Sequence, residues 1–298
     1  MNIRFREHTF APTAERPLVM GIVNLGRDSV ADALRLDGPA EQYARALELI
    51  AAGADIIDVG VQSGRTDTAA VSESEELALL APLVSRLADE GVCVSVDAWR
   101  PAVVQGAIDA GAALVNDVSG LADVRVADIA AQSGAGLVVM HTRARPKERR
   151  FPTYQDPLAD VAGFLAERCE TARKSGVDAE RIVIDPGLDF AKAPSDSIEI
   201  LRRLPELHAL GYPLLLAVSR KYFVGMLTGR RPLDRLAGTL AAVAHGVGCG
   251  AQIVRVHDVA AVADFLTVRE VLLAEGIPQL QGDPDDEALK WIAPKRGA

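Results

Sequence analysis

Short aliphatic runs alternate with longer amphipathic segments along most of this chain. The runs are rich in Val, Ile and Leu, a composition that suits strands buried on both faces of a parallel sheet. Eight such runs, each followed by a segment with helical periodicity, predict a closed parallel barrel, and therefore a single (β/α)8 TIM barrel of the α/β class. We expect strands at residues 18–23, 55–59, 92–96, 114–115, 137–140, 182–184, 214–218 and 253–256.

The amphipathic segments carry helix-boundary residues that support this register. Ser72 with Glu75 is a capping-box pattern, and Pro101 stands where a first helical residue is expected. A glycine follows six of the segments and predicts a left-handed helix end. These glycines are Gly53, Gly91, Gly111, Gly134, Gly176 and Gly211. We expect helices near residues 40–52, 73–90, 101–110, 124–133, 157–175, 197–210, 233–248 and 258–274.

A doubly wound sheet is the structural alternative to the barrel. That fold more often carries a glycine-rich nucleotide fingerprint after its first strand, and residues 21–26 do not form one. No change in composition divides the chain. We therefore expect one domain over residues 1–298, with the barrel at about 18–275 and a C-terminal tail at 276–298.

Composition narrows the environment and the partners of the barrel. Aromatic residues make up only 4% of the chain, so aliphatic side chains must fill the interior. The net charge of −9 argues against a nucleic-acid partner. No apolar run approaches the ~20 residues that span a bilayer, so we expect a cytoplasmic protein without a membrane partner. Cys93, Cys169 and Cys249 lack metal-site spacing and are expected to be buried free thiols.

Polar residues stand at the carboxyl end of every expected strand. In TIM barrels this end carries the active site, so convergent polar groups there predict a ligand pocket. The residues are Asn24, Asp58, Asp97, Asn116, Asp117, His141, Asp185, Arg220, Lys221, Arg255 and His257.

These polar residues divide by strand into acceptors and cations. Asp97, Asn116 and Asp185 offer hydrogen-bond acceptors, whereas residues 221, 255 and 257 offer cationic donors. The cations follow the last two strands, where barrels commonly bind phosphate beside a helix N-terminus, here at Val259. The pattern predicts an anion at one end of the pocket and a guanidine-like ring edge, as in a pterin, at the other.

Several of the same residues have simpler structural interpretations. Asp117 is typical of a turn, His141 caps the fifth strand or binds, and Asp58 fits a buried, hydrogen-bonded acid. Arg220 forms an ion pair while Lys221 binds the ligand, or the reverse. The basic loop at residues 143–150 is either a solvated connection or a docking site for an acidic partner.

Seven segments, in order, resemble the motifs of the dihydropteroate synthase family. They are residues 20–24 (Met-Gly-Ile-Val-Asn), 53–60 (Gly-Ala-Asp-Ile-Ile-Asp-Val-Gly), 95–97 (Ser-Val-Asp), 116–120 (Asn-Asp-Val-Ser-Gly), 185–187 (Asp-Pro-Gly), 218–221 (Val-Ser-Arg-Lys) and 255–259 (Arg-Val-His-Asp-Val). The resemblance extends from Leu18 to about Leu273. It implies condensation of p-aminobenzoate with dihydropterin-methyl pyrophosphate, and a homodimer.

The resemblance also implies roles for individual residues. Asp97, Asn116, Asp185 and Lys221 would hold the pterin ring, with Phe190 and Arg65 as further substrate-binding residues. Arg255 and His257 would hold the pyrophosphate, with Asn24 acting through a Mg2+ ion. The groups expected to act in catalysis are Asp97, Lys221, Arg255 and His257.

The chain departs from the family pattern in its loops. The loop after the first strand lacks the usual Thr, Pro, Phe and two glycines, and the second loop keeps Arg65 but loses its Glu, its Thr and a Pro-Gly turn. Asp189 replaces a glycine and Tyr222 a small Ser near the substrate positions. We therefore expect a diverged paralogue that binds a pterin but has weak or absent synthase activity. A functional synthase and a non-catalytic binding or regulatory protein are the alternatives.

Overall fold

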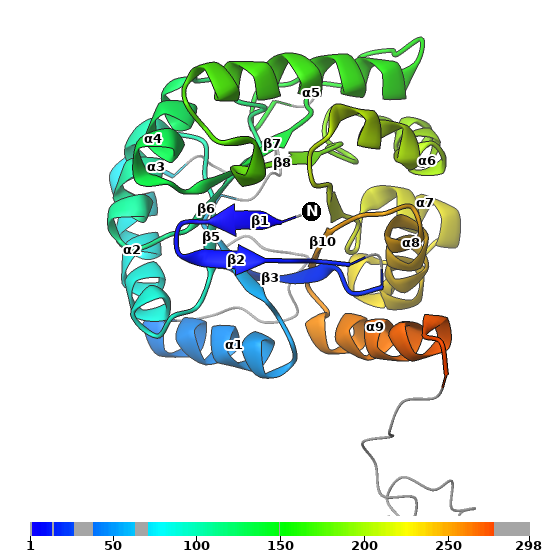
Figure 1. Cartoon of the computed structure of the whole chain (residues 1–298), viewed down its shortest axis with the longest axis horizontal. Coiled ribbons are helices and arrows are strands. Elements are labelled where there is room, and N and C mark those ends of the chain that lie inside the picture. Colours follow the sequence, from blue (N-terminus) through cyan, green and yellow to red (C-terminus); the bar gives the residue numbers. More distant parts are fainter. Residues whose placement is uncertain (1, 14, 27–37, 63–70, 149, 277–298) are drawn as a thin grey trace, which may run out of the picture.

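The eight aliphatic runs form eight parallel strands, which confirms the predicted (β/α)8 barrel (Figure 1). The computed structural model describes residues 2–13, 15–26, 38–62, 71–148 and 150–276. The sheet order β8-β7-β6-β5-β4-β3-β10-β9 is closed by a parallel bridge between Ile184 and Leu214. The strands are β3 (Leu18–Asn24), β4 (Ile56–Gly60), β5 (Val94–Asp97), β6 (Leu114–Asp117), β7 (Gly136–Met140), β8 (Ile182–Asp185), β9 (Leu215–Ala217) and β10 (Ile253–Val256).

Helices surround the barrel and follow the strands in turn (Figure 1). They are α1 (Pro39–Ala51), α2 (Glu73–Asp89), α3 (Pro101–Asp109), α4 (Arg125–Ser133), α5 (Pro157–Lys174), α6 (Pro194–Arg202), α7 (Tyr222–Thr228), α8 (Leu236–Gly248) and α9 (Val259–Leu273), with 3-10 turns η1 (Ala179–Arg181), η2 (Leu204–Leu210) and η3 (Pro232–Asp234).

The helix boundaries largely follow the sequence patterns. The Ser72–Glu75 capping box and Pro101 at the start of α3 are confirmed. The six expected helix-ending glycines all have φ between 71° and 108°. The helix expected at 197–210 is instead α6 followed by η2. Pro205 lacks an N–H and obstructs the preceding turn, so the α-helix ends before it.

A β-hairpin that the sequence patterns did not predict closes the amino-terminal mouth of the barrel. It consists of β1 (Ile3–Phe5) and β2 (His8–Phe10) and lies across the strands in Figure 1. Ile3 and Phe5 are fully buried in an apolar cluster with side chains from the barrel interior. A Cβ at Gly136 would lie 2.1 Å from the Phe5 ring, so β7 begins with the one residue type that admits this ring. The polar strand-end residues lie at the opposite, carboxyl-terminal mouth.

The remaining expectations about packing concern the cysteines and the membrane. All three cysteines are free, and Cys93 and Cys169 are buried as expected, whereas Cys249 is partly exposed. Burial raises the pKa of both buried thiols to about 12, so they remain protonated. Within the described residues, no helix is both long enough and apolar enough to cross a bilayer.

Candidate active site at the carboxyl ends of the strands

Asp58 is a buried hydrogen-bonding centre inside the carboxyl-terminal mouth. Its Oδ1 accepts from Ser95 Oγ at 2.6 Å, while its Oδ2 accepts from Arg255 Nε at 2.6 Å and from Asn116 Nδ2 at 3.3 Å. The donors come from β5, β6 and β10, so one carboxylate ties together side chains from several strands. The interpretation of Asp58 as a buried, hydrogen-bonded acid is confirmed.

Asp97 accepts a hydrogen bond from the same guanidinium that contacts Asp58, that of Arg255. Arg255 Nη2 donates to Asp97 Oδ2 at 3.0 Å, so the cation bridges two acids. Burial raises the pKa of Asp97 to about 7 against the lowering effect of Arg255, and the charge of Asp58 adds to the rise. The Oδ1 of Asp97 is buried and has no hydrogen-bond partner within the described part of the chain. A buried acceptor without a partner costs free energy, so this oxygen is a candidate acceptor for an N–H donor of a ligand.

Asp185 and Lys221 form the next part of the mouth. Gly187 N donates to Asp185 Oδ1 at 2.7 Å, and Lys221 Nζ donates to the Leu188 carbonyl at 2.9 Å. Burial raises the pKa of Asp185, although the Gly187 hydrogen bond and the charge of Lys221 oppose the rise. Burial likewise lowers the pKa of Lys221. Its ammonium lies 4.5 Å from the centre of the Phe190 ring, within cation–π range.

Arg220 and His257 complete the cationic side. Arg220 forms two hydrogen bonds with Asp258, at 2.6 and 3.0 Å, which confirms that Arg220 forms an ion pair. The Nδ1 of His257 lies 2.9 Å from Ser219 Oγ, which also accepts from the His257 backbone N–H. Ser219 therefore orients the imidazole.

Arg235 is a supporting residue that the sequence analysis missed. Its Nη1 donates to the carbonyls of Arg220 and Lys221 at 2.9 and 3.1 Å, and its Nε donates to the Arg230 carbonyl at 2.9 Å. The guanidinium thus holds the turn that presents Lys221. No periodicity marks Arg235, because its acceptors are backbone atoms of other turns.

Two further strand-end residues have structural roles. Asp117 Oδ1 accepts from Ser119 N at 2.7 Å, which confirms the turn interpretation. His141 is fully buried, and its Nε2 lies 2.9 Å from Asp160 Oδ2. Arg143 forms two hydrogen bonds with the same carboxylate, at 2.8 and 2.9 Å. The basic loop is therefore anchored at its first arginine.

The structure describes the expected metal ligand, Asn24, but not the expected loop residue Arg65. Asn24 ends β3 beside Gly60, and a Cβ at Gly60 would lie 3.8 Å from the Asn24 Oδ1. Arg65 lies outside the described residues, as do most of the departures in the first and second loops.

Asp189, which stands where the family usually has a glycine, is hydrogen-bonded within the protein. Its carboxylate accepts from Ser197 Oγ at 3.1 Å and from the Tyr222 backbone N–H, so it is engaged with α6 and the start of α7. The Tyr222 side chain is 55% exposed. The Asp189 carboxylate is therefore held between these helix termini.

Comparison with known proteins gives a family that agrees with this fold. The family model described as "Pterin binding enzyme" matches residues 20–257. The chain therefore belongs to the pterin-binding enzyme family.

The relatives of the chain show which members of that family it resembles. The dihydropteroate synthase of Bacillus subtilis is 39% identical over 264 residues, covering 88% of this chain and 90% of the relative. A Xanthomonas albilineans dihydropteroate synthase with 4-aminobenzoic acid superposes with a TM-score of 0.83 at 37% identity, over 93% of this chain and all of the other. A Burkholderia cenocepacia dihydropteroate synthase complexed with 7,8-dihydropteroate gives 0.82 at 38%, over 91% and 96%. These matches place the chain in the dihydropteroate synthase family.

Proposed function

We propose that this protein is a working dihydropteroate synthase, which joins p-aminobenzoate to dihydropterin-methyl pyrophosphate and releases pyrophosphate. The observation that carries the proposal is the buried Oδ1 of Asp97, which has no hydrogen-bond partner among the described residues and lies beside Arg255, with Asn116, Asp185 and Lys221 in the same mouth. Relatives of this name at 35–40% identity over most of the chain support the same activity.

The acceptors suit the ring of such a substrate. A pterin presents adjacent N–H donors along its guanidine-like edge, and carboxylates accept such donors in parallel. Asp97 and Asp185 would accept these hydrogen bonds, while Lys221 would donate to a ring acceptor. Asn116 is held by Asp58 and can offer its carbonyl oxygen to the ring.

The cations suit the departing pyrophosphate. The amine nitrogen of p-aminobenzoate forms a bond to the methylene carbon as the carbon–oxygen bond breaks, and that electron pair passes to the pyrophosphate oxygen. The amine proton is lost to solvent. Arg255 and His257, close to the N-terminus of α9, would stabilise the charge that develops on oxygen. The nucleophile itself needs mainly orientation.

The side-chain oxygen of Asn24 is a ligand type that suits a magnesium ion held largely by substrate. Mg2+ prefers oxygen ligands and commonly uses few protein groups together with phosphate oxygens. Within the described residues, no three His, Cys, Asp or Glu side chains are arranged to hold a metal by themselves. We therefore propose Asn24 as a protein oxygen ligand. The ion would supply charge stabilisation to the pyrophosphate.

The interpretation of weak or absent activity has less support than the functional synthase. Asp189 is bound to α6 and α7, and most of the changed first and second loops lie outside the described residues. We therefore propose that the loop differences alter the surroundings of a working site.

Pyrophosphate release tests the proposed activity. Purified protein is given dihydropterin-methyl pyrophosphate, p-aminobenzoate and Mg2+, and pyrophosphate and dihydropteroate are measured together. We expect both products in equal amounts at roughly one turnover per second or more, as for ordinary enzymes, and no dihydropteroate without p-aminobenzoate. A folded protein that binds the pterin substrate but forms no dihydropteroate would instead support the weak or inactive paralogue.

We also propose a homodimer through the face formed by α7, η3 and α8. Exposed apolar side chains gather on these consecutive elements, and their exposure in a monomer is unfavourable. They are Met226, Leu227, Leu233 and Leu236, 38–67% exposed. Sedimentation of the purified chain should give a dimer mass, and Leu227→Glu should shift it toward the monomer. A monomeric wild type at micromolar concentration would refute the dimer.

A further inference from the structure

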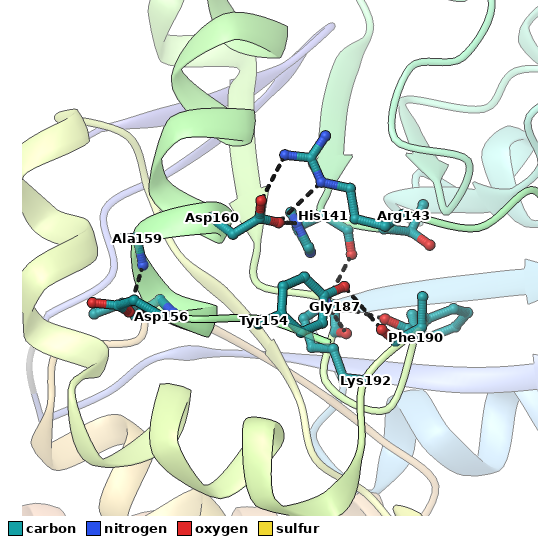
Figure 2. Close-up of polar contacts among 12 residues, drawn as sticks. His141, Arg143, Tyr154, Asp156, Ala159, Asp160, Gly187, Phe190 and Lys192 are labelled. Atoms are coloured by element: carbon teal, nitrogen blue, oxygen red, sulfur yellow. Dashed lines mark hydrogen bonds and ion pairs between the residues drawn. The ribbon is translucent and has the colours of Figure 1, made fainter. Parts of the chain in front are cut away.

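A buried lysine joins two loops at the carboxyl-terminal mouth. The Nζ of Lys192 donates to the carbonyls of Gly187 at 2.8 Å, Phe190 at 3.1 Å and His141 at 3.2 Å (Figure 2). Its side chain is among the largest that are fully buried, with 1% exposed. Two of the acceptors belong to the loop after β8, and the third follows β7.

The convergence of these carbonyls explains why a cation stands there. Gly187 has φ of +62°, and a Cβ at this residue would lie 2.0 Å from the His141 carbonyl oxygen, so the two loops pack backbone against backbone. Three carbonyl oxygens that point at one place repel one another. An ammonium group provides three N–H donors and a positive charge, and therefore satisfies all three oxygens at once.

The loop that Lys192 holds has a strained backbone. Asp189 and Ala191 both lack the freedom of glycine, yet their φ angles are +65° and +51°. Such angles persist only where the surroundings impose them, and they concentrate at functional sites. Tyr154 adds one restraint, because its hydroxyl donates to the Ala191 carbonyl at 2.9 Å.

The restrained loop carries groups of the active site. It begins directly after Asp185, whose Oδ1 accepts from Gly187 N, and it presents the Phe190 ring 4.5 Å from the Lys221 ammonium. We propose that Lys192 is a positioning residue for the synthase reaction: its ammonium locks the loop after β8 against His141 and thereby fixes Asp185 and Phe190 for substrate binding. This role rests on the proposed function.

The titratable groups that face Lys192 come from several elements. They are Asp185 on β8, Lys221 after β9, Asp160 on α5, Asp196 on α6 and His141 after β7. Burial lowers the pKa of Lys192 to about 7, and the acids oppose that effect. A neutral amine has only two N–H donors and cannot satisfy three carbonyls. The lock should therefore weaken as the pH rises above neutrality.

A variant matched for stability separates positioning from folding. Lys192→Met keeps the length of the side chain and removes its charge and donors. Phe5→Leu lowers stability at the opposite mouth, far from the loop. Both are assayed well below their melting temperatures. We expect the KM for the pterin substrate to rise about tenfold or more in Lys192→Met, since buried acceptors lose their partner, and less than twofold in Phe5→Leu.

Equal KM values in the two variants would overturn the role of Lys192. A wild type without synthase turnover would count against the proposed function. The hold of Lys192 on the loop is measured separately, by hydrogen exchange in the unmodified protein. The same measurement decides the matter if Lys192→Met does not fold.

Hydrogen exchange of the wild type from pH 6 to 9, corrected for the intrinsic rate, measures the lock directly. We expect protection of residues 186–193 to fall about tenfold or more relative to α1, which faces none of these groups. Constant relative protection would show that the ammonium does not hold the loop.

Discussion

The two mouths of this barrel are closed by opposite kinds of chemistry. At the amino-terminal mouth, Ile3 and Phe5 are fully buried in an apolar cluster. At the carboxyl-terminal mouth, Asp58, Asp97 and Arg255 form a buried charged network. The same parallel strands connect the two mouths, so the difference arises from the polar residues at one end of the strands and from the hairpin that covers the other end.

This difference separates the groups that stabilise the barrel from those that bind substrate. The apolar mouth gains free energy from burial and contains little that a ligand could recognise. The charged mouth bears the cost of desolvation, visible in the raised pKa values of Asp97 and Asp185. Changes at the two mouths should therefore affect different measurements.

The largest expected effect is at the charged mouth. Asp185→Asn keeps the shape of the side chain and removes the charge, so the acceptor for the substrate ring is weakened. We expect kcat/KM to fall about 10³-fold, roughly 4 kcal/mol, in the pyrophosphate assay. Asp178→Asn, an exposed acid whose side chain is 58% accessible, serves as the matched control and should stay near wild type. Comparable losses in both variants would contradict the division between the mouths.

At the apolar mouth the expected effect is on stability. Phe5→Ala leaves a cavity under β7 and should lower the free energy of unfolding by about 3 kcal/mol, measured by urea denaturation. KM should stay within twofold of wild type because no substrate group lies there. A variant of unchanged stability would show that the hairpin does not close the core.

Asp97 should make binding pH-dependent. Its pKa is raised to about 7 by burial, and the protonated acid is a poorer acceptor for the pterin edge. We expect kcat/KM to rise by up to about tenfold per pH unit below about pH 7, as one proton is lost. Asp97→Asn should have lower activity and a flat profile between pH 5 and 7. A slope retained in that variant would assign the ionisation to another group.

The smallest expected effect concerns His141. Burial lowers its pKa to about 3, so the folded protein binds this proton more weakly than the unfolded chain. The stabilising contribution is complete above about pH 6.5 and is lost as the pH falls toward 3, by up to about 1.4 kcal/mol per unit. Urea titrations at pH 7 and 5.5 should show a smaller difference for His141→Gln than for wild type. An equal difference in unfolding free energy between pH 7 and 5.5 in the two proteins would show that His141 does not cause the pH dependence.

The barrel could be predicted because its signal is local and repeated. All eight expected strands are present, since buried parallel strands are continuous aliphatic runs. The hairpin was missed because β1 and β2 have three residues each, too short for a periodic pattern. The short helix α7 was missed for the same reason.

The site could be predicted only in part from the chain. The positions of the expected strand ends predicted that five polar residues share one mouth, because all parallel strands of a barrel end on the same side. These residues are Asp97, Asn116, Asp185, Lys221 and Arg255. The direction of Asp189 and the roles of Lys192 and Arg235 depend on hydrogen bonds to irregular turns, several of them to backbone carbonyls, and such contacts leave no periodic pattern in the sequence. Arg255 also bridges the acids directly, so the cations and acceptors are interleaved rather than separated.

Titration calorimetry with dihydropterin-methyl pyrophosphate and Mg2+ tests most directly whether the charged mouth binds this substrate. We predict one site per chain with a Kd in about the micromolar range, and much weaker binding by Asp185→Asn. Absence of binding to the folded wild type, or equal affinity in the two proteins, would contradict the assignment.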